Sequence, residues 1–270
     1  MMSIIAARLF LFPHQDDEFA VFDLLENCGE DGVVPLCVFL TCSPCGSGAT
    51  AIRNSESMRV LRRLGVGDDR ILFVGENLGV VDCRVSDRMG VIADWLHDFL
   101  VSHEEISEIF IPAWEGGHPD HDSVHALVLS VAVRLNRAVK ILQYPLYNGR
   151  GVPGGMFRII SPLPENGPCC FRDVSAWRRV CFLALCFQYR SQWRSWIGLF
   201  PALVWRYIRN DHLALQETEI FRVHEPPHAG PLYYERRGFA RWDVLGPKIS
   251  RFTREWRPSG SLDALSESGK

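Results

Sequence analysis

Between residues 1 and 150 the chain alternates between short apolar runs of strand length and longer segments whose apolar residues have helical spacing. The strand-like runs are 9–12, 33–40, 71–74, 109–112 and 139–147. The helical patterns between them cover 17–28, 49–64, 86–102 and 120–136. Strands that alternate with helices at this spacing form right-handed βαβ units. The sequence therefore predicts an α/β fold with a Rossmann-like parallel sheet flanked by helices.

The pattern is looser beyond residue 150. There the sequence predicts a Gly- and Pro-rich loop over 149–168, a helix over 174–190 and a strand or extended segment over 214–223. Because neither a repeat nor a linker divides the chain, we expect one domain over 1–256. In it a Rossmann-like core ends near residue 150, and 151–256 form a C-terminal elaboration. The polar composition of 257–270 is typical of a disordered tail.

The composition argues against several partners and compartments. A net charge of −3 and an isoelectric point near 6.3 provide no basic field for a phosphate polymer, so no nucleic acid partner is expected. The nine cysteines show no spacing typical of a secreted disulfide framework. Arg8 interrupts the first apolar stretch and no long uncharged apolar run follows, so neither a signal peptide nor a membrane span is predicted. We expect a cytoplasmic protein.

Two adjacent carboxylates and an imidazole follow the first predicted strand, where residues 13–18 read Pro-His-Gln-Asp-Asp-Glu. Burying this much negative charge is costly unless a cation compensates it. With a divalent cation, one carboxylate ligates the metal and its neighbour faces a water molecule. The plainer interpretation is that Asp16 and Asp17 cap the following helix and favour its dipole.

A second polar motif follows the run 109–112, where residues 116–122 read Gly-Gly-His-Pro-Asp-His-Asp. Alone, it is equally typical of a polar loop that enters a helix with an aspartate cap. However, ligands of open α/β sheets bind outside the carboxyl ends of the strands, and both motifs fall at that edge. A catalytic zinc needs three protein ligands and an open position. His14, Asp17 and one of the two histidines of the second motif supply that number.

The pair of motifs resembles the LmbE-like, or PIG-L, family of zinc-dependent N-deacetylases. The signatures of that family are a His-Pro-Asp-Asp-Glu segment near the N-terminus and a His-Pro-Asp-His segment after a later strand. Weaker similarities are Arg53-x-x-Glu56 at the start of a helix, Tyr-Arg-Ser-Gln at 189–192 and Glu-Ile-Phe-Arg-Val at 219–223. The resemblance extends over residues 8–223, strongly at the two motifs and loosely elsewhere.

Carried over to this sequence, the resemblance implies that His14, Asp17 and His121 bind Zn²⁺, or another divalent metal such as Fe²⁺. Asp16 would be the general base that activates a water molecule, and His118 would polarise the substrate carbonyl or stabilise the oxyanion. Asp120 would hold His118 in one tautomer. The implied reaction is hydrolysis of the acetamide of an N-acetylated amino sugar, such as an N-acetylglucosamine conjugate, to acetate and an amine. Whether Asp16 or His118 protonates the amine stays open.

The sequence also departs from the family pattern at two places near the predicted site. Gln15 stands where the family usually has proline, which predicts a looser turn. Thr-Cys-Ser at 41–43 stands where many relatives have Thr-Asp-Gly, which predicts different pocket contacts. Arg53 would anchor a sugar hydroxyl or a phosphate, or else pair with Glu56 of the same helix. These departures concern the substrate, because no predicted metal ligand is replaced.

Two rival functions remain from the sequence. A metal hydrolase acting on another amide or ester would use the same ligands. A catalytically silent sugar-binding relative would keep the fold alone, and the intact base and ligand set argue against it. The sequence is compatible with a homo-oligomer.

Three other features carry weaker hypotheses. Cys42 and Cys45 have redox-motif spacing, although a pocket-lining loop is the better interpretation. His125 lies one helical turn after His121 and could compete for the metal, but we expect it to face away. The segment 193–206 mixes tryptophan, arginine and aliphatic residues, as membrane-interface segments do. Such contact would suit a lipid-linked sugar, whereas Gly198 and Pro201 argue against a regular amphipathic helix and favour a core or dimer-facing subdomain.

Overall fold

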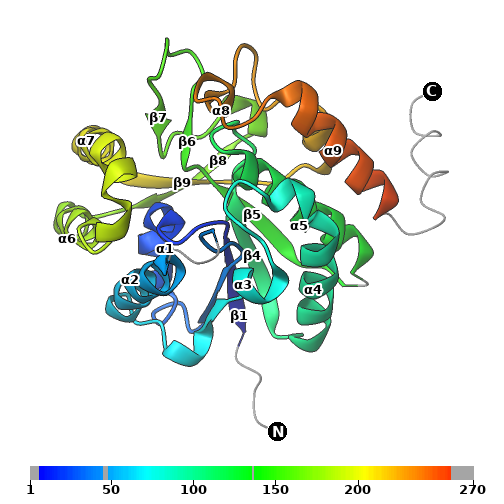
Figure 1. The fold of residues 1–270 in the computed structure, drawn as a ribbon. Coiled ribbons are helices and arrows are strands. Elements are labelled where there is room, and N and C mark those ends of the chain that lie inside the picture. The colour runs from blue at the N-terminus through cyan, green and yellow to red at the C-terminus, as the bar shows by residue number, and fades with distance from the viewer. Residues whose placement is uncertain (1–5, 45–47, 136, 257–270) are drawn as a thin grey trace, which may run out of the picture.

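The computed structural model describes residues 6–44, 48–135 and 137–256, in which seven strands form one sheet in the order β3-β2-β1-β4-β5-β9-β8 (Figure 1). The strands are β1 (Ala7–Phe12), β2 (Val34–Phe39), β3 (Ile71–Phe73), β4 (Ile106–Pro112), β5 (Lys140–Tyr144), β8 (Cys169–Asp173) and β9 (His212–Glu217). The strands β3, β2, β1, β4 and β5 are parallel to one another. The strand β9 pairs antiparallel with β5, and β8 pairs antiparallel with β9. The α/β fold with a flanked, Rossmann-like sheet is confirmed, and its C-terminal part adds the antiparallel edge.

Helices cover both faces of the sheet (Figure 1). They are α1 (Phe22–Asn27), α2 (Ala49–Arg63), α3 (Gly75–Leu78), α4 (Met89–Ser102), α5 (Pro119–Arg134), α6 (Ala176–Cys186), α7 (Trp193–Arg209), α8 (Tyr233–Arg236) and α9 (Trp242–Glu255). A short 3₁₀ helix, η1 (Asp17–Val21), precedes α1. A separate two-stranded ribbon pairs β6 (Tyr147–Asn148) with β7 (Arg158–Ile159).

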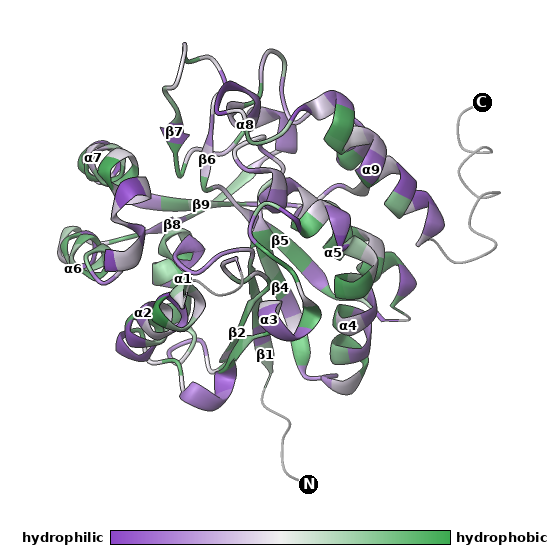
Figure 2. Ribbon diagram, in the orientation of Figure 1, coloured by the Kyte–Doolittle hydropathy of each residue, from purple (hydrophilic) through white to green (hydrophobic). Residues whose placement is uncertain are grey.

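The strands divide their side chains between two apolar clusters, as the period of two residues in a strand requires. In β1, Phe10 and Phe12 face the cluster built with α1, α2, α6 and α7. Leu9 and Leu11 face the opposite cluster, built with α4, α5 and α9. All four side chains are fully buried, which explains why the strand reads as a continuous apolar run rather than as an alternation. Figure 2 shows apolar (green) residues in the central strands of the sheet, with hydrophilic (purple) residues among them in β5.

The C-terminal elaboration holds elements that the sequence does not predict and one that it predicts incorrectly. The strand β8 and the helix α9 are absent from the predicted pattern. The segment 193–209 forms one continuous helix, α7, although Gly198 and Pro201 argue against it in sequence. Proline removes one helical hydrogen bond. Because Pro201 is exposed, the carbonyl that loses this partner lies near the surface.

Some sequence predictions fall on residues outside the described ranges. The tail 257–270 and Cys45 are among them. Cys42 is described, and its thiol donates a hydrogen bond to the Val80 carbonyl at 3.3 Å. No helix in the described ranges combines the length and the apolar composition needed to cross a membrane.

Candidate active site and metal centre

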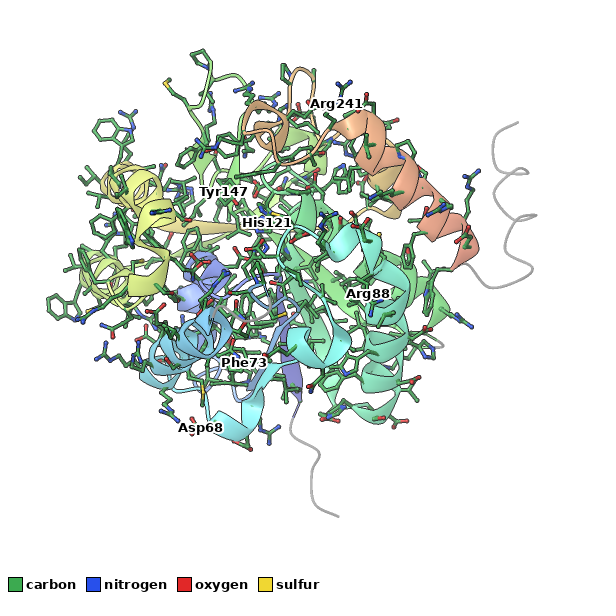
Figure 3. The ribbon with its side chains drawn as sticks, viewed as in Figure 1. Asp68, Phe73, Arg88, His121, Tyr147 and Arg241 are labelled. Carbon is green, nitrogen blue, oxygen red and sulfur yellow. The ribbon has the colours of Figure 1, made fainter. Side chains whose placement is uncertain are left out.

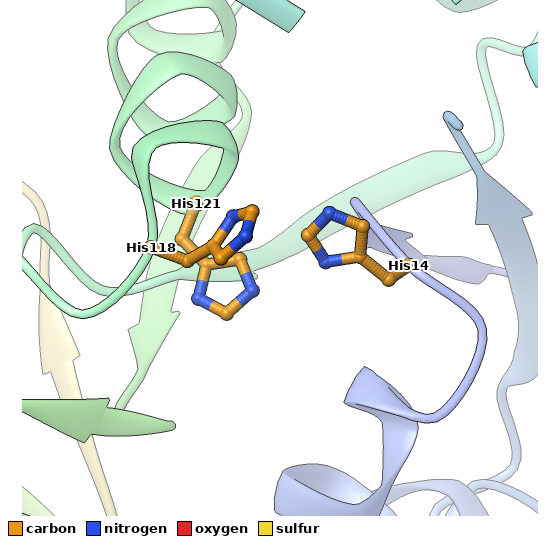
Figure 4. Close-up of side chains that lie close together, drawn as sticks. All are labelled: His14, His118 and His121. Carbon is orange, nitrogen blue, oxygen red and sulfur yellow. The ribbon is translucent and has the colours of Figure 1, made fainter. Parts of the chain in front are cut away.

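The two polar motifs meet at the point where the strand order of the sheet reverses. The first follows β1 and the second follows β4, and these strands are neighbours at the centre of the sheet. The chain leaves β1 towards β2 on one side and leaves β4 towards β5 on the other, which opens a crevice at their carboxyl ends. In Figure 4, His14 faces His118 and His121, which stand at the start of α5. The predicted convergence of the two motifs is therefore observed.

The turn after β1 is held in an unusual backbone conformation. Asp16 has φ 112°, in the left-handed region that few residues other than glycine adopt. Its backbone amide donates to the Glu18 carboxylate at 2.8 Å. The buried Gln15 side chain donates to the Thr41 carbonyl at 3.1 Å and to the Asn54 side-chain oxygen at 2.7 Å. These two hydrogen bonds hold the Gln15 side chain in the turn, and the looser turn expected from the sequence stays a prediction.

The loop before α5 is shaped by one carboxylate and two glycines. The Asp122 side chain accepts hydrogen bonds from the backbone amides of Glu115 (3.3 Å) and Gly116 (3.2 Å). Gly116 has φ +70°, and a Cβ at Gly117 would lie 1.9 Å from the Tyr147 carbonyl oxygen. Both positions therefore require glycine. The result is a tight approach that delivers His118 as the N-cap of α5.

A buried group around His121 has the composition of a divalent-metal site. His121 Nε2 lies 3.2 Å from Asp17 Oδ1, and His14 Nδ1 lies 3.1 Å from Asp17 Oδ2. His121 Nδ1 is buried without a hydrogen-bond partner among the described residues, and the buried Nε2 faces only the Asp17 carboxylate. Burial deprives such an imidazole of its solvation, which costs free energy. A cation bound to one ring nitrogen would compensate for that cost. Donors from His14, His118 and His121 also lie close enough together to share one ion.

The electrostatics of Asp17 agree with a cationic environment. Burial alone would raise the pKa of this carboxyl, but the imidazoles of His121 and His14 hold it well below its ordinary range. Asp17 is therefore a carboxylate in the folded protein, as a metal ligand must be. His121 stands near the middle of the molecule in Figure 3, beside Tyr147, whose ring centroid lies 5.5 Å from that of His121.

The structure places the Asp120 carboxylate on His14 rather than on the ring of His118. Its Oδ2 lies 3.0 Å from His14 Nε2 and accepts the backbone amide of Cys83 at 2.6 Å, while Oδ1 accepts that of Val85 at 3.0 Å. A carboxylate behind a histidine is the usual support of a metal-binding imidazole. The Asp120 carboxylate therefore contacts the ring of His14 and not that of His118.

His118 is fixed by the backbone of Asp120 instead. The Asp120 amide donates to His118 Nδ1 at 3.3 Å, so Nδ1 is an acceptor and the neutral ring carries its proton on Nε2. Burial, together with the nearby charge of His14, lowers the pKa of His118 to about 3. In the neutral form the ring still offers one N–H donor, and Nε2 lies 3.6 Å from the exposed Cys83 thiol at the edge of the cavity.

Asp16 receives a hydrogen bond from the C-terminal elaboration. The indole Nε1 of Trp196 in α7 donates to Asp16 Oδ2 at 3.1 Å. Burial and the adjacent Asp17 carboxylate raise the pKa of Asp16 well above its ordinary value. The pKa values of the two neighbouring aspartates are therefore shifted in opposite directions. This is the arrangement expected of a metal ligand next to a proton acceptor. Sequence reasoning does not find Trp196, because its segment is interpreted as core or surface.

His14, Asp16, Asp17 and His118 line a cavity of about 250 Å³. The guanidinium of Arg53 enters it from α2 and lies 3.4 Å from an oxygen of Asp82 and 2.8 Å from the side-chain oxygen of Gln192. Asp82 Oδ1 also lies 3.2 Å from His14 Nε2. Burial opposes ionisation of Asp82, yet His14, His118 and Arg53 keep its pKa below the ordinary range. Asp82 has no motif around it in the sequence, and only the fold brings it to the site, together with Gln192 of the Tyr-Arg-Ser-Gln segment.

Comparison with known proteins identifies the segment that carries both motifs. A family model described as PIG-L: GlcNAc-PI de-N-acetylase matches residues 9–132. Residues 9–132 belong to the PIG-L, or LmbE-like, family. Among curated proteins, none matches the chain by sequence.

Solved structures of similar fold extend beyond this PIG-L segment. A triple mutant of the deacetylase of teicoplanin biosynthesis is 17% identical, with a TM-score of 0.60, and the match covers 79% of this chain and 98% of that one. The A40926 pseudoaglycone deacetylase is 15% identical (TM-score 0.59; coverage 81% and 99%). The N,N′-diacetylchitobiose deacetylase of Pyrococcus horikoshii is 17% identical (TM-score 0.55; coverage 84% and 87%). At these identities the likeness concerns the fold.

Two of the three weaker sequence similarities also meet in space, and they join the PIG-L segment to the C-terminal elaboration. The buried Glu56 carboxylate accepts the backbone amide of Ser191 at 3.0 Å and its hydroxyl at 2.6 Å. Arg53, one turn earlier in α2, reaches Gln192. The alternative pairing of Arg53 with Glu56 is therefore not the one observed, since each binds the 190–192 turn separately.

His125 faces away from the PIG-L site, as expected. Its Nδ1 lies 2.9 Å from the Pro112 carbonyl oxygen, and its ring packs against Trp114. Burial lowers the pKa of His125 to about 4, so the ring is neutral near neutral pH. This histidine anchors α5 to the end of β4.

Proposed function

We propose that this chain is a zinc-dependent N-deacetylase that hydrolyses the acetamide of an N-acetylated amino sugar conjugate. The observation that carries the proposal is His121, a fully buried imidazole whose Nε2 faces the Asp17 carboxylate next to His14 and whose Nδ1 has no hydrogen-bond partner among the described residues. The family description names a de-N-acetylase, and the similar folds include a diacetylchitobiose deacetylase and a teicoplanin deacetylase recorded in a zinc-inhibited form. Each of these supports the same chemistry.

His14, Asp17 and His121 would hold the zinc ion, and Asp120 would orient His14 from behind. When bound, zinc polarises an amide carbonyl and lowers the pKa of a water molecule to about 7. Asp16 would accept the proton of the attacking water, because its carboxylate shares the cavity and Trp196 fixes one of its oxygens. The water oxygen then becomes part of acetate.

His118 would stabilise the negative charge that develops on the carbonyl oxygen. Its Nδ1 is occupied by a backbone amide, so Nε2 is the nitrogen left to donate to that oxygen. As the carbon–nitrogen bond breaks, the amine takes the proton that Asp16 accepted from the water and leaves as a free amino sugar; His118 would be the donor only in its imidazolium form. Both candidate donors line the same cavity.

Arg53 and Asp82 would bind sugar hydroxyls, since they place a donor and an acceptor in the cavity next to His14. A second hollow of about 290 Å³ shares Tyr147, Ser195 and Leu199 with the catalytic cavity. It leads away from the metal ligands, towards Arg194. This hollow provides room for the rest of a conjugate beyond the acetylated sugar.

The experiment that tests the proposal combines metal analysis with acetate release from a panel of N-acetylhexosamine compounds. We expect Asp16→Ala to retain zinc and lose turnover, and His121→Ala to lose zinc. Asp17→Asn serves as a second ligand variant, and the remote His97→Ala is the matched control. Circular dichroism establishes that each variant is folded.

Each part of the assignment has its own contrary result. Full zinc occupancy in His121→Ala would overturn the ligand set. Unchanged turnover in Asp16→Ala would overturn the base. Turnover of other amides or esters without acetate release from any N-acetyl sugar would favour the rival hydrolase, and an inert folded zinc protein would favour the sugar-binding relative.

A further inference from the structure

The helices α6 and α7 carry large apolar side chains on the outer surface of the molecule. Of the fifteen exposed large hydrophobic residues in the described ranges, seven fall between residues 177 and 208. They are Trp177, Val180, Phe187, Trp193, Ile197, Trp205 and Ile208. Trp177 is 74% exposed and Ile208 is 70% exposed. We refer to these seven residues as the outer hairpin face. Scattered exposed apolar residues are ordinary, but a group of this size needs an explanation.

The spacing of these residues aligns them along each helix. In α7, Trp193, Ile197, Trp205 and Ile208 are separated by multiples of three or four residues, with the exposed Pro201 between them. In α6, Trp177 and Val180 have the same relation, and Phe187 follows two turns later. The opposite sides of the helices bury Phe182, Cys186, Trp196 and Leu203 in the core. Each helix is therefore apolar on two sides, and only one of them is covered by the protein.

The charge of this region differs from that of the rest of the chain. Residues 174–210 contain six arginines and no acidic residue, whereas the whole chain has a net charge of −3. Arg190, Arg194 and Arg209 are exposed, and no carboxylate of the described residues forms an ion pair with them. The guanidiniums of Arg194 and Arg209 lie 5.6 and 5.3 Å from the ring centroids of Trp193 and Trp205. Tryptophan and arginine thus alternate on one surface.

The catalytic cavity opens beside this surface. Ser195 and Leu199 of α7 line the cavity, while Trp193 and Ile197 point outward from the same helical turns. An open apolar hollow of about 430 Å³ lies in the outer hairpin face itself, where Phe187, Trp193 and Ile197 line it. The hollow is lined by Cys186, Phe187, Tyr189, Trp193, Trp196 and Ile197. Trp196 lines this hollow and also donates the hydrogen bond to Asp16.

We propose that the outer hairpin face docks on a membrane surface that contains anionic lipids, which brings the mouth of the catalytic cavity against the lipid headgroups. Tryptophan and isoleucine would enter the boundary between headgroups and acyl chains, and the three unpaired arginines would bind lipid phosphates. The hollow would accept an acyl chain of the bilayer. A second copy of the same face fits less well, because a two-fold interface would bring the arginines of both copies together.

The test is co-sedimentation of the purified chain with vesicles of phosphatidylcholine alone or mixed with phosphatidylglycerol. We expect binding to the mixed vesicles, weaker binding at high salt, and a blue shift of tryptophan fluorescence. The double variant Trp205→Ser with Ile208→Ser should bind about ten-fold more weakly or worse, since both side chains lose their burial in lipid. Arg190→Gln with Arg209→Gln should bind weakly to mixed vesicles and lose its salt dependence.

The matched control replaces exposed apolar residues elsewhere, with Val101→Ser and Val133→Ser, and should bind as the wild type does. All substituted side chains are exposed, so thermal unfolding should be unchanged. Wild-type protein that stays in the supernatant would overturn the proposal, as would equal binding by Trp205→Ser with Ile208→Ser. A concentration-dependent dimer that this variant abolishes would assign the face to a second copy instead. Docking is measured without any substrate, so its failure is independent of the proposed deacetylation.

Discussion

The Asp120 carboxylate lies 3.0 Å from Nε2 of His14, on the side of the ring opposite to the nitrogen that faces Asp17. This arrangement supports the ring from behind and leaves His14 Nδ1 for a metal. We expect Asp120→Asn to weaken divalent-metal affinity about 10- to 100-fold, because the supporting charge that makes the imidazole a stronger ligand is lost. Competition with a chromophoric chelator measures this affinity. An unchanged affinity with reduced turnover would return Asp120 to the role beside His118 that the sequence resemblance implies.

His118 should matter for turnover and not for metal binding. We expect His118→Ala to retain the metal and to lower kcat by about 10²- to 10³-fold, because one preorganised donor to the oxyanion is lost. The KM should change little. Metal analysis and steady-state kinetics on the same preparation provide both values. Loss of metal together with activity would contradict this role and would make His118 a ligand, since it also lies within reach of an ion shared with His14 and His121.

Glu56 should contribute to the stability of the whole fold, because it fastens the 190–192 turn to α2. In Glu56→Ala, the Ser191 amide and hydroxyl lose their buried partner, and with it two hydrogen bonds. We expect the free energy of unfolding to fall by about 1–3 kcal/mol. Urea denaturation measures the change, with Ser55→Ala on the exposed side of the same helix as the control. Equal midpoints for the two variants would show that the turn is held by other contacts.

Glu115 should make stability depend on pH. Burial raises the pKa of this carboxyl from 4.5 to about 7, although the Leu146 and Tyr147 amides and the Asn148 side chain donate to it and oppose the shift. The folded state therefore holds a proton that the unfolded state releases at lower pH. The resulting stabilisation is complete below pH 4.5 and is lost as the pH rises through about 7.

Glu115→Gln removes this titration. We expect the free energy of unfolding of the wild type to fall relative to that of Glu115→Gln as the pH rises between 4.5 and 7. Urea denaturation across this range provides the comparison, with the exposed Glu104→Gln as the control. A constant difference between the wild type and Glu115→Gln would contradict the raised pKa.

The parallel strands of the core can be predicted from the sequence, because strands that are buried on both faces appear as continuous apolar runs. In β1 each of Leu9, Phe10, Leu11 and Phe12 is buried, so the strand appears as an uninterrupted apolar run. The edge strand β8 lacks this signal. Its Cys170 and Phe171 are exposed, and the strand exists because it pairs with β9, which is distant in the chain. The sequence also argues against helix α7, because the segment contains Pro201. The helix tolerates this proline because the position lies on the surface.

The sequence by itself determined the parallel α/β core and the residue types at its catalytic edge, because strand periodicity and chain direction place His14 and the His118–His121 turn at adjacent strand ends. Only the tertiary structure decided the partners of those residues. It assigned the Asp120 carboxylate to His14, brought Asp82 and Gln192 to Arg53, and delivered Trp196 of α7 to Asp16. These contacts join segments up to 180 positions apart. Periodicity reports which face of an element is buried, whereas the partner of a side chain depends on how separate elements pack.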